Sequence, residues 1–244
     1  MGMRLSKRNL IFSGVAAIGL VAATMGSPAH AGTVTYVTPS GATSGGQAVD
    51  AEAVFTTGTH SLTITLTNLE ANPTSVVQNL SDLNFTLSNG TNAGFSLSSS
   101  SGQEVTVDGS RTPSLGSTVS TGWELSTSGT TQGTLDVLAA GGAGPAHLII
   151  GPPGTGGTYS NANGSIEGNG PHNPFLNQTA TFTITGTGIT ADTTISAMSF
   201  SFGTTAGNDV TGQVSVPEPS SLVLGLLGLG LVGAIGYRRK GRRA

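Results

Sequence analysis

The stretch most suggestive of chemistry is 147–158, which reads H-L-I-I-G-P-P-G-T-G-G-T. An apolar run followed by a Gly-rich loop is the outline of a phosphate-binding loop, which also needs a lysine after its last glycine and then a helix. Gly157 stands at the lysine position, and the residues after Thr158 are turn formers. We therefore predict a Gly/Pro loop after a strand, and no nucleotide partner.

The residues that usually bind metal ions do not have the spacing of a metal site in this sequence. The chain has no cysteine. After the N-terminal region it has three histidines, which are far apart and show no H-x-H or H-x-x-x-H spacing: His60, His147 and His172. Asp50 with Glu52, or Asn208 with Asp209, could offer oxygens to calcium, but no calcium-loop consensus surrounds them. We predict no cofactor and keep calcium as an alternative ligand.

Catalytic patterns are equally sparse. The sequence has no G-x-S-x-G nucleophile elbow. A glycosidase needs two carboxylates converging in a cleft, which a sequence cannot place. Trp123, the single tryptophan, lies in a short apolar segment and is predicted to pack in the core. We predict that the protein is not an enzyme, with a secreted hydrolase as the remaining alternative.

The elements that would position such residues are short strands. In 61–68, leucine and isoleucine alternate with threonine, the pattern of a strand with one buried face. Similar strands are predicted at 33–37, 48–55, 84–87, 95–97, 104–107, 122–125, 134–138, 147–150, 179–185, 195–202 and 210–216, and loops at 98–102 and 151–170. Without sustained helical periodicity, this predicts an all-β fold, an antiparallel β-sandwich, with a barrel or a solenoid as the lesser alternative.

The charge is distributed unevenly along the chain. Between Gly32 and Val216, Arg111 is the only Lys or Arg, against eleven Asp and Glu, a net charge of −10. Nucleic-acid binding requires cationic side chains to replace phosphate counterions, so we predict no nucleic-acid partner. An acidic surface rich in hydroxyl groups suits a secreted protein whose partners are cations or neutral glycans.

The N-terminus has the three parts of a secretory signal peptide. Arg4, Lys7 and Arg8 form a basic head, residues 10–24 are mainly apolar, and Ala29-His30-Ala31 is a small-x-small cleavage site before Gly32. Signal cleavage is therefore assigned to Ala29, Ala31 and Gly32, with residues 1–31 as the signal peptide.

The C-terminus contains a second membrane-directed segment. Pro217, Glu218 and Pro219 precede an apolar, Leu/Gly-rich run, predicted as a transmembrane helix at 220–237. The run ends at a basic cluster that we expect on the cytoplasmic side, within 238–244: Arg238, Arg239, Lys240, Arg242 and Arg243. The exported domain is then 32–216 and the C-terminal signal 217–244.

This three-part tail resembles the PEP-CTERM sorting signal of Gram-negative bacteria. The resemblance implies recognition by exosortase, a membrane protease-transpeptidase that processes the signal near the Pro-Glu-Pro motif. Residues 149–211 are similar to a stretch that recurs in uncharacterised proteins with this signal. No activity is known for that stretch.

Together these features predict a non-enzymatic exported protein of the cell envelope or extracellular matrix. It would be held in the inner membrane by its C-terminal helix, then processed or anchored by an exosortase and carried to the cell surface or outside the cell. The resemblance further implies a link to exopolysaccharide and biofilm. The alternatives are a glycan- or calcium-binding extracellular module and a secreted hydrolase.

Overall fold

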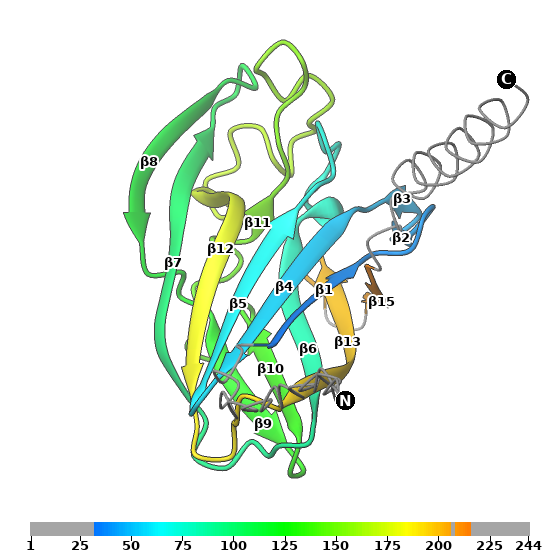
Figure 1. Ribbon diagram of the computed structural model, residues 1–244. Coiled ribbons are helices and arrows are strands. Elements are labelled where there is room, and N and C mark those ends of the chain that lie inside the picture. Colours follow the sequence, from blue (N-terminus) through cyan, green and yellow to red (C-terminus); the bar gives the residue numbers. More distant parts are fainter. Residues whose placement is uncertain (1–31, 206–207, 216–244) are drawn as a thin grey trace, which may run out of the picture.

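The computed structural model describes residues 32–205 and 208–215, and these form two packed layers of antiparallel strands (Figure 1). The larger layer has the order β8-β7-β12-β5-β4-β1-β15. Its strands are β8 (Pro113–Val119), β7 (Ser96–Val107), β12 (Phe175–Thr185), β5 (Ser61–Asn68), β4 (Ala51–Gly58), β1 (Gly32–Val37) and β15 (Gln213–Val214). The all-β prediction is confirmed.

The smaller layer has the order β9-β10-β6-β13-β14. Its strands are β9 (Glu124–Ser128), β10 (Gln132–Asp136), β6 (Leu80–Ser88), β13 (Thr194–Phe202) and β14 (Asp209–Thr211). The two-residue β11 (Ile149–Ile150) pairs with β12 in parallel and with β6 antiparallel, so it joins the layers at one end. A separate hairpin, β2 (Thr43–Ser44) with β3 (Gln47–Ala48), and a 3-10 turn, η1 (Val76–Gln78), complete the described elements.

The core lies between the layers because each strand turns its apolar side chains inward. Leu62, Ile64 and Leu66 of β5 are fully buried, while the intervening threonines remain half-buried on the outer face. The Phe55 and Phe85 rings, from β4 and β6, meet across the layers with centroids 5.8 Å apart. The alternation predicted for 61–68 is thus the feature that sets the two faces of the larger layer.

Three stretches differ from the predicted loops and strands. The strand predicted at 210–216 is divided at Gly212 between β14 in the smaller layer and β15 in the larger one. Residues 98–102 were predicted as a loop but lie within β7, where serines pair with the threonines of β12. Their backbone is satisfied by ladder hydrogen bonds, although small polar side chains give no hydrophobic alternation. β8 was not predicted, because it begins at Pro113, contains Gly116 and exposes most of its side chains.

The loop at 151–170 contains neither helix nor strand, yet it is packed against the sandwich. Tyr159, Ala162 and Ile166 are buried, and the Tyr159 hydroxyl donates to the Gly151 carbonyl at 2.9 Å. A Cβ on Gly151 would lie 1.9 Å from the Glu70 carbonyl oxygen, so only glycine fits at this position. The Gly/Pro loop therefore serves close backbone packing, and no helix follows it within the described residues.

Among residues 32–205 and 208–215, no helix has the length and hydropathy needed to cross a membrane. The predicted signal peptide and the predicted helix at 220–237 lie outside these residues.

Candidate functional site

The outer face of the smaller layer carries a row of acidic side chains across neighbouring strands. The strand register places Glu124 opposite Asp136, Asp136 opposite Asp82, Asp82 opposite Ser201, and Ser201 opposite Asp209. Side chains at directly opposed positions on one face are neighbours, so carboxylates gather along this row. Of the row's members, only Asp209 had been considered from the sequence as a ligand candidate.

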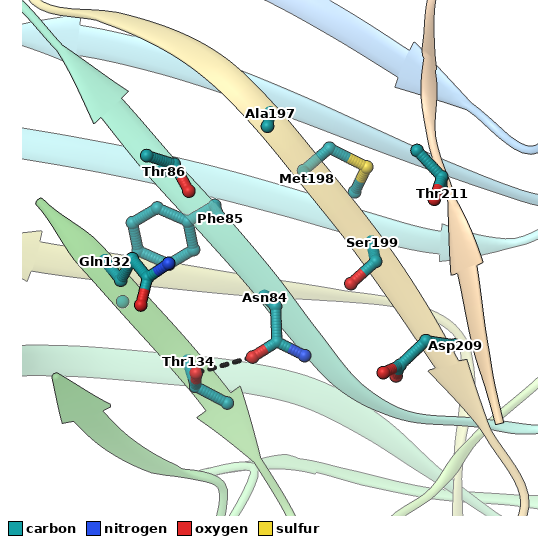
Figure 2. Close-up of a pocket in the computed structure, with 11 residues that line it drawn as sticks. Asn84, Phe85, Thr86, Gln132, Thr134, Ala197, Met198, Ser199, Asp209 and Thr211 are labelled. Atoms are coloured by element: carbon teal, nitrogen blue, oxygen red, sulfur yellow. Dashed lines mark hydrogen bonds between the residues drawn. The ribbon is translucent and has the colours of Figure 1, made fainter. Parts of the chain in front are cut away.

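A shallow hollow of about 430 Å³ lies next to this row. Figure 2 shows that its labelled polar side chains come from β6, β10, β13 and β14. The lining comprises amide, hydroxyl, carboxylate and small apolar groups: Asn84, Phe85, Thr86, Gln132, Gly133, Thr134, Ala197, Met198, Ser199, Asp209 and Thr211. Because these residues lie on paired strands, the hollow is preformed and not built from loops.

Hydrogen bonds between side chains hold some of the polar groups in and beside the hollow in place, and leave others free to bind a ligand. Thr134 Oγ1 donates to Asn84 Oδ1 at 2.6 Å, and Asn84 Nδ2 donates to Asp82 Oδ1 at 3.0 Å. The Ser201 hydroxyl donates to Asp209. Within the described residues, the side chains of Gln132, Ser199 and Thr211 have no hydrogen-bond partner, so they can offer donors and acceptors to a ligand.

The carboxyl group of Asp82 has an altered acidity. Burial, together with the nearby carboxylates of Asp136 and Asp209, raises the pKa of Asp82 from 3.8 to about 7, although the Ser201 hydroxyl opposes this rise. Asp82 therefore exchanges its proton near neutral pH. The Asp82 carboxyl group can therefore donate a hydrogen bond when it is protonated, or add a negative charge to the outer face when it is ionised.

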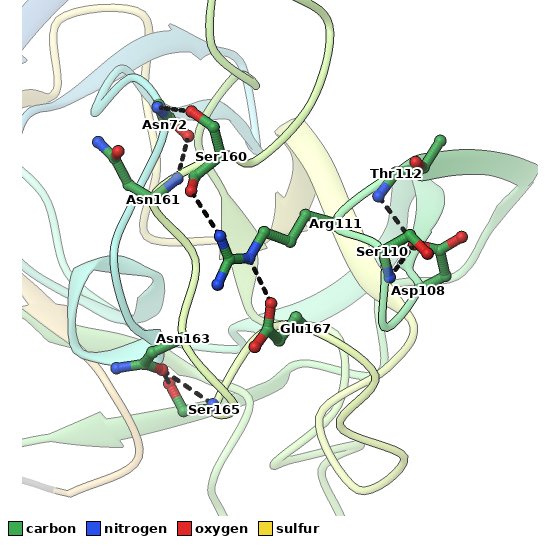
Figure 3. A network of polar contacts seen from close by, with 10 residues as sticks. All are labelled: Asn72, Asp108, Ser110, Arg111, Thr112, Ser160, Asn161, Asn163, Ser165 and Glu167. Atoms are coloured by element: carbon green, nitrogen blue, oxygen red, sulfur yellow. Dashed lines mark hydrogen bonds and ion pairs between the residues drawn. The ribbon is translucent and has the colours of Figure 1, made fainter.

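A second polar network ties the 151–170 loop to the end of the β7–β8 hairpin (Figure 3). Arg111 forms an ion pair with Glu167, and its Nη1 donates to the Ser160 carbonyl at 3.0 Å. Asp108 accepts hydrogen bonds from the backbone of Ser110 and Thr112, both at 2.8 Å. Within the exported region, the single arginine is thus used to hold a loop.

Of the three histidines in the described region, His147 and His172 have side-chain contacts with polar groups, whereas His60 shows only backbone hydrogen bonds. His147 Nδ1 lies 2.9 Å from the Thr121 carbonyl oxygen, and its Nε2 lies 3.1 Å from Glu104 Oε1. His172 Nδ1 lies 2.6 Å from the Ser165 carbonyl oxygen. Within residues 32–205 and 208–215, no group of three or more His, Asp or Glu is arranged to hold a metal ion.

The other ligand candidates from the sequence lie at the starts of two strands, Asp50 and Glu52 at β4 and Asn208 and Asp209 at β14. Asp50 accepts a hydrogen bond from Thr38 Oγ1 at 3.0 Å, and Glu52 lies on β4 in the larger layer. Asn208 Nδ2 donates to the carbonyl oxygens of Phe202 and Thr205, both at 3.5 Å. Trp123 is 2% exposed, so the prediction that it packs in the core is confirmed.

Both ends of the described region lie at one edge of the larger layer. Gly32, the residue predicted to follow signal cleavage, is the first residue of β1. β15 pairs with β1 through Tyr36 opposite Val214 and Val37 opposite Gln213, and the Ser215 N–H donates to the Thr35 carbonyl at 2.8 Å. The described structure therefore ends beside its own first strand, immediately before the predicted sorting signal.

Several predicted positions lie outside the described residues. These are the cleavage residues Ala29 and Ala31, the motif Pro217, Glu218 and Pro219, and the basic cluster Arg238, Arg239, Lys240, Arg242 and Arg243.

Comparison with protein families identifies the tail. Residues 215–240 match the family model described as the PEP-CTERM protein-sorting motif. The chain carries a PEP-CTERM sorting motif. This motif is the mark of an exported protein targeted by an exosortase, and its position confirms the resemblance found in the sequence. Searches of curated proteins and of solved structures give no match for the chain.

The hollow and its acidic row could not be identified from the sequence. Asn84 and Gln132 are brought together by pairing of β6 with β10, and Ser199 by pairing of β6 with β13. The one local signal was the outward alternation of Asp82, Asn84 and Thr86 along a strand. That signal marks a polar face but does not say which strands extend it.

Proposed function

We propose that this protein is a non-enzymatic component of the cell envelope or extracellular matrix, sorted through its PEP-CTERM signal. The match at residues 215–240 carries the proposal. The apolar run and the terminal basic cluster support a precursor that is held in the membrane. The acidic charge of residues 32–216 supports a protein that is soluble after its release. The family's association with exopolysaccharide production supports a role in biofilm.

Mass spectrometry of the mature protein, from cells with and without the exosortase, tests the sorting step. We expect loss of the tail near Pro217, Glu218 and Pro219 only when the enzyme is present. Replacement of the three motif residues by alanine should preserve the intact C-terminus in both strains. An intact tail in wild-type cells that contain the exosortase would exclude processing.

A second candidate, a module that binds neutral glycans, is favoured by the hollow of the smaller layer. Gln132, Ser199 and Thr211 provide amide and hydroxyl groups from β10, β13 and β14 of the same layer. None of the lining residues carries a positive charge that would attract an anionic ligand. Sugars present many hydroxyl groups that donate and accept hydrogen bonds, so they match this lining. Rigid placement on strands reduces the entropy lost on binding.

Titration calorimetry with exopolysaccharide purified from cells that carry this protein tests this candidate. Replacing both Gln132 and Thr211 by alanine should weaken binding about tenfold, equivalent to about 1.4 kcal/mol. These side chains are exposed, so folding should be unaffected. Thr181→Ala, on the outer face of the other layer, is the matched control. Equal affinity in all three proteins would rule out the hollow, and a parallel titration with calcium examines the ion alternative.

A further inference from the structure

The last described strand, β15, is held to the sandwich by few interactions. Gln213 and Val214 are both exposed, and Val214 retains 51% of its accessible surface. The attachment consists of a two-residue ladder with β1 and the hydrogen bond from Ser215 N–H to the Thr35 carbonyl. Segments with few buried contacts and solvent-exposed hydrogen bonds open at low free-energy cost.

The neighbouring residue on the N-terminal side is fixed much more firmly. Gly212 donates its N–H to the Met198 carbonyl at 3.0 Å, and a Cβ at Gly212 would lie 2.1 Å from Met198 Sδ. β14, just before it, pairs with β13 in the smaller layer. The chain therefore passes at Gly212 from a packed position to a weakly attached one.

Pairing with β1 leaves little chain between the domain and the sorting motif. Only Val216 separates Ser215 from Pro217. Two extended residue steps span at most about 7 Å, whereas a domain of this length has a radius of gyration of about 16 Å. While β15 is paired, the surface of the folded domain therefore lies within about 7 Å of the motif beside which the enzyme must act.

We propose that residues 213–215 form a detachable clasp, which leaves β1 when the membrane enzyme takes hold of the tail. Release of these three residues adds about 10 Å of reach, with Gly212 as the pivot. The enzyme can then draw an extended segment into its active site without the domain obstructing it. This inference rests on the proposed exosortase processing and adds a step that governs its rate.

An engineered disulfide across the clasp tests the step. Val37 and Gln213 are directly opposed, and hydrogen-bonded strand partners have Cα atoms about 5.5 Å apart, within disulfide range. The chain has no cysteine, so V37C with Q213C can form no other intramolecular bridge. Membrane fractions containing the exosortase are incubated with the full chain, with or without a thiol reductant, and tail removal is followed by mass.

We expect the oxidised double variant to lose its tail at least tenfold more slowly than the reduced one. The matched control is T56C with T63C, which bridges β4 and β5 but leaves the clasp free, and should be processed equally in both states. Insertion of Gly-Ser-Gly-Ser after Ser215 should restore fast processing to the oxidised clasp variant, because it supplies the reach that opening would provide.

Equal rates for the oxidised and reduced clasp variants would overturn the proposal, as would slow processing that the insertion does not relieve. These results differ from failure of the sorting function itself. If exosortase processing is absent, the wild-type tail stays intact whatever the redox state, and the clasp has no role to perform.

Discussion

Trp123→Ala is expected to lower the free energy of unfolding by about 3–5 kcal/mol, the usual cost of removing a buried tryptophan side chain. The indole ring packs on Phe182 of β12 with centroids 5.2 Å apart, and Nε1 donates to the His147 carbonyl at 3.0 Å. Truncation would leave a cavity between the layers and an unpaired carbonyl. Chemical denaturation followed by far-ultraviolet circular dichroism measures the effect, since the variant has no tryptophan fluorescence.

Trp123→Phe separates the two contributions. It keeps an aromatic ring in the core but loses the hydrogen bond to His147, so a smaller cost of about 1–2 kcal/mol is expected. A loss below about 1 kcal/mol in the alanine variant would contradict the assignment of Trp123 to the core.

The second large effect concerns pH. Because the pKa of Asp82 rises from 3.8 to about 7 on folding, the folded state binds this proton more tightly than the unfolded state. The stabilisation is complete below pH 4 and is lost as pH rises through 7. The shift sets an upper limit of about 4 kcal/mol, and solvent around a half-buried carboxyl group reduces the expected change to about 1–3 kcal/mol.

Asp82→Asn should remove most of this dependence and make the protein more stable than wild type at pH 8. The amide oxygen can still accept the hydrogen bond from Asn84, while repulsion from Asp136 and Asp209 is removed. Urea unfolding between pH 4 and 8 gives the two slopes. Asp192→Asn, at an exposed acid, is the control and should leave the wild-type slope unchanged. A variant as pH-dependent as wild type would exclude Asp82 as the source.

A residual slope in Asp82→Asn is expected from Glu70. Burial and the nearby Asp50 carboxylate raise the pKa of Glu70, which acts in the same direction.

The sequence predicted well those features that depend on local alternation. β5 was recognisable because its apolar side chains recur at every second residue and all enter the core. β7 was interrupted in the prediction because a serine run has no such contrast, and the pairing partners on β12 and β8 keep it extended. Strand existence is thus decided by neighbours wherever side chains are uniformly small and polar.

The candidate site was less accessible to sequence reasoning than the tail. The PEP-CTERM signal is contiguous, so its three parts can be identified in order along the chain. The hollow instead depends on register: Thr134 meets Asn84 only because β10 pairs with β6 in one alignment, and a shift of one residue would turn either side chain to the core. A single sequence contains no direct record of that alignment.

The pairing of β1 with β15 also has a consequence for the order of folding. The first strand of the exported region finds this partner only in the last one, so closing that edge requires a contact between opposite ends of the domain. Such distant contacts carry a large loop-closure entropy and slow folding. If the chain is exported N-terminus first, as its predicted signal peptide implies, β1 crosses the membrane before β15, and the edge of β1 remains unpaired until β15 has crossed as well. The domain would therefore complete its sheet only after both of its ends had been delivered to the same side of the membrane.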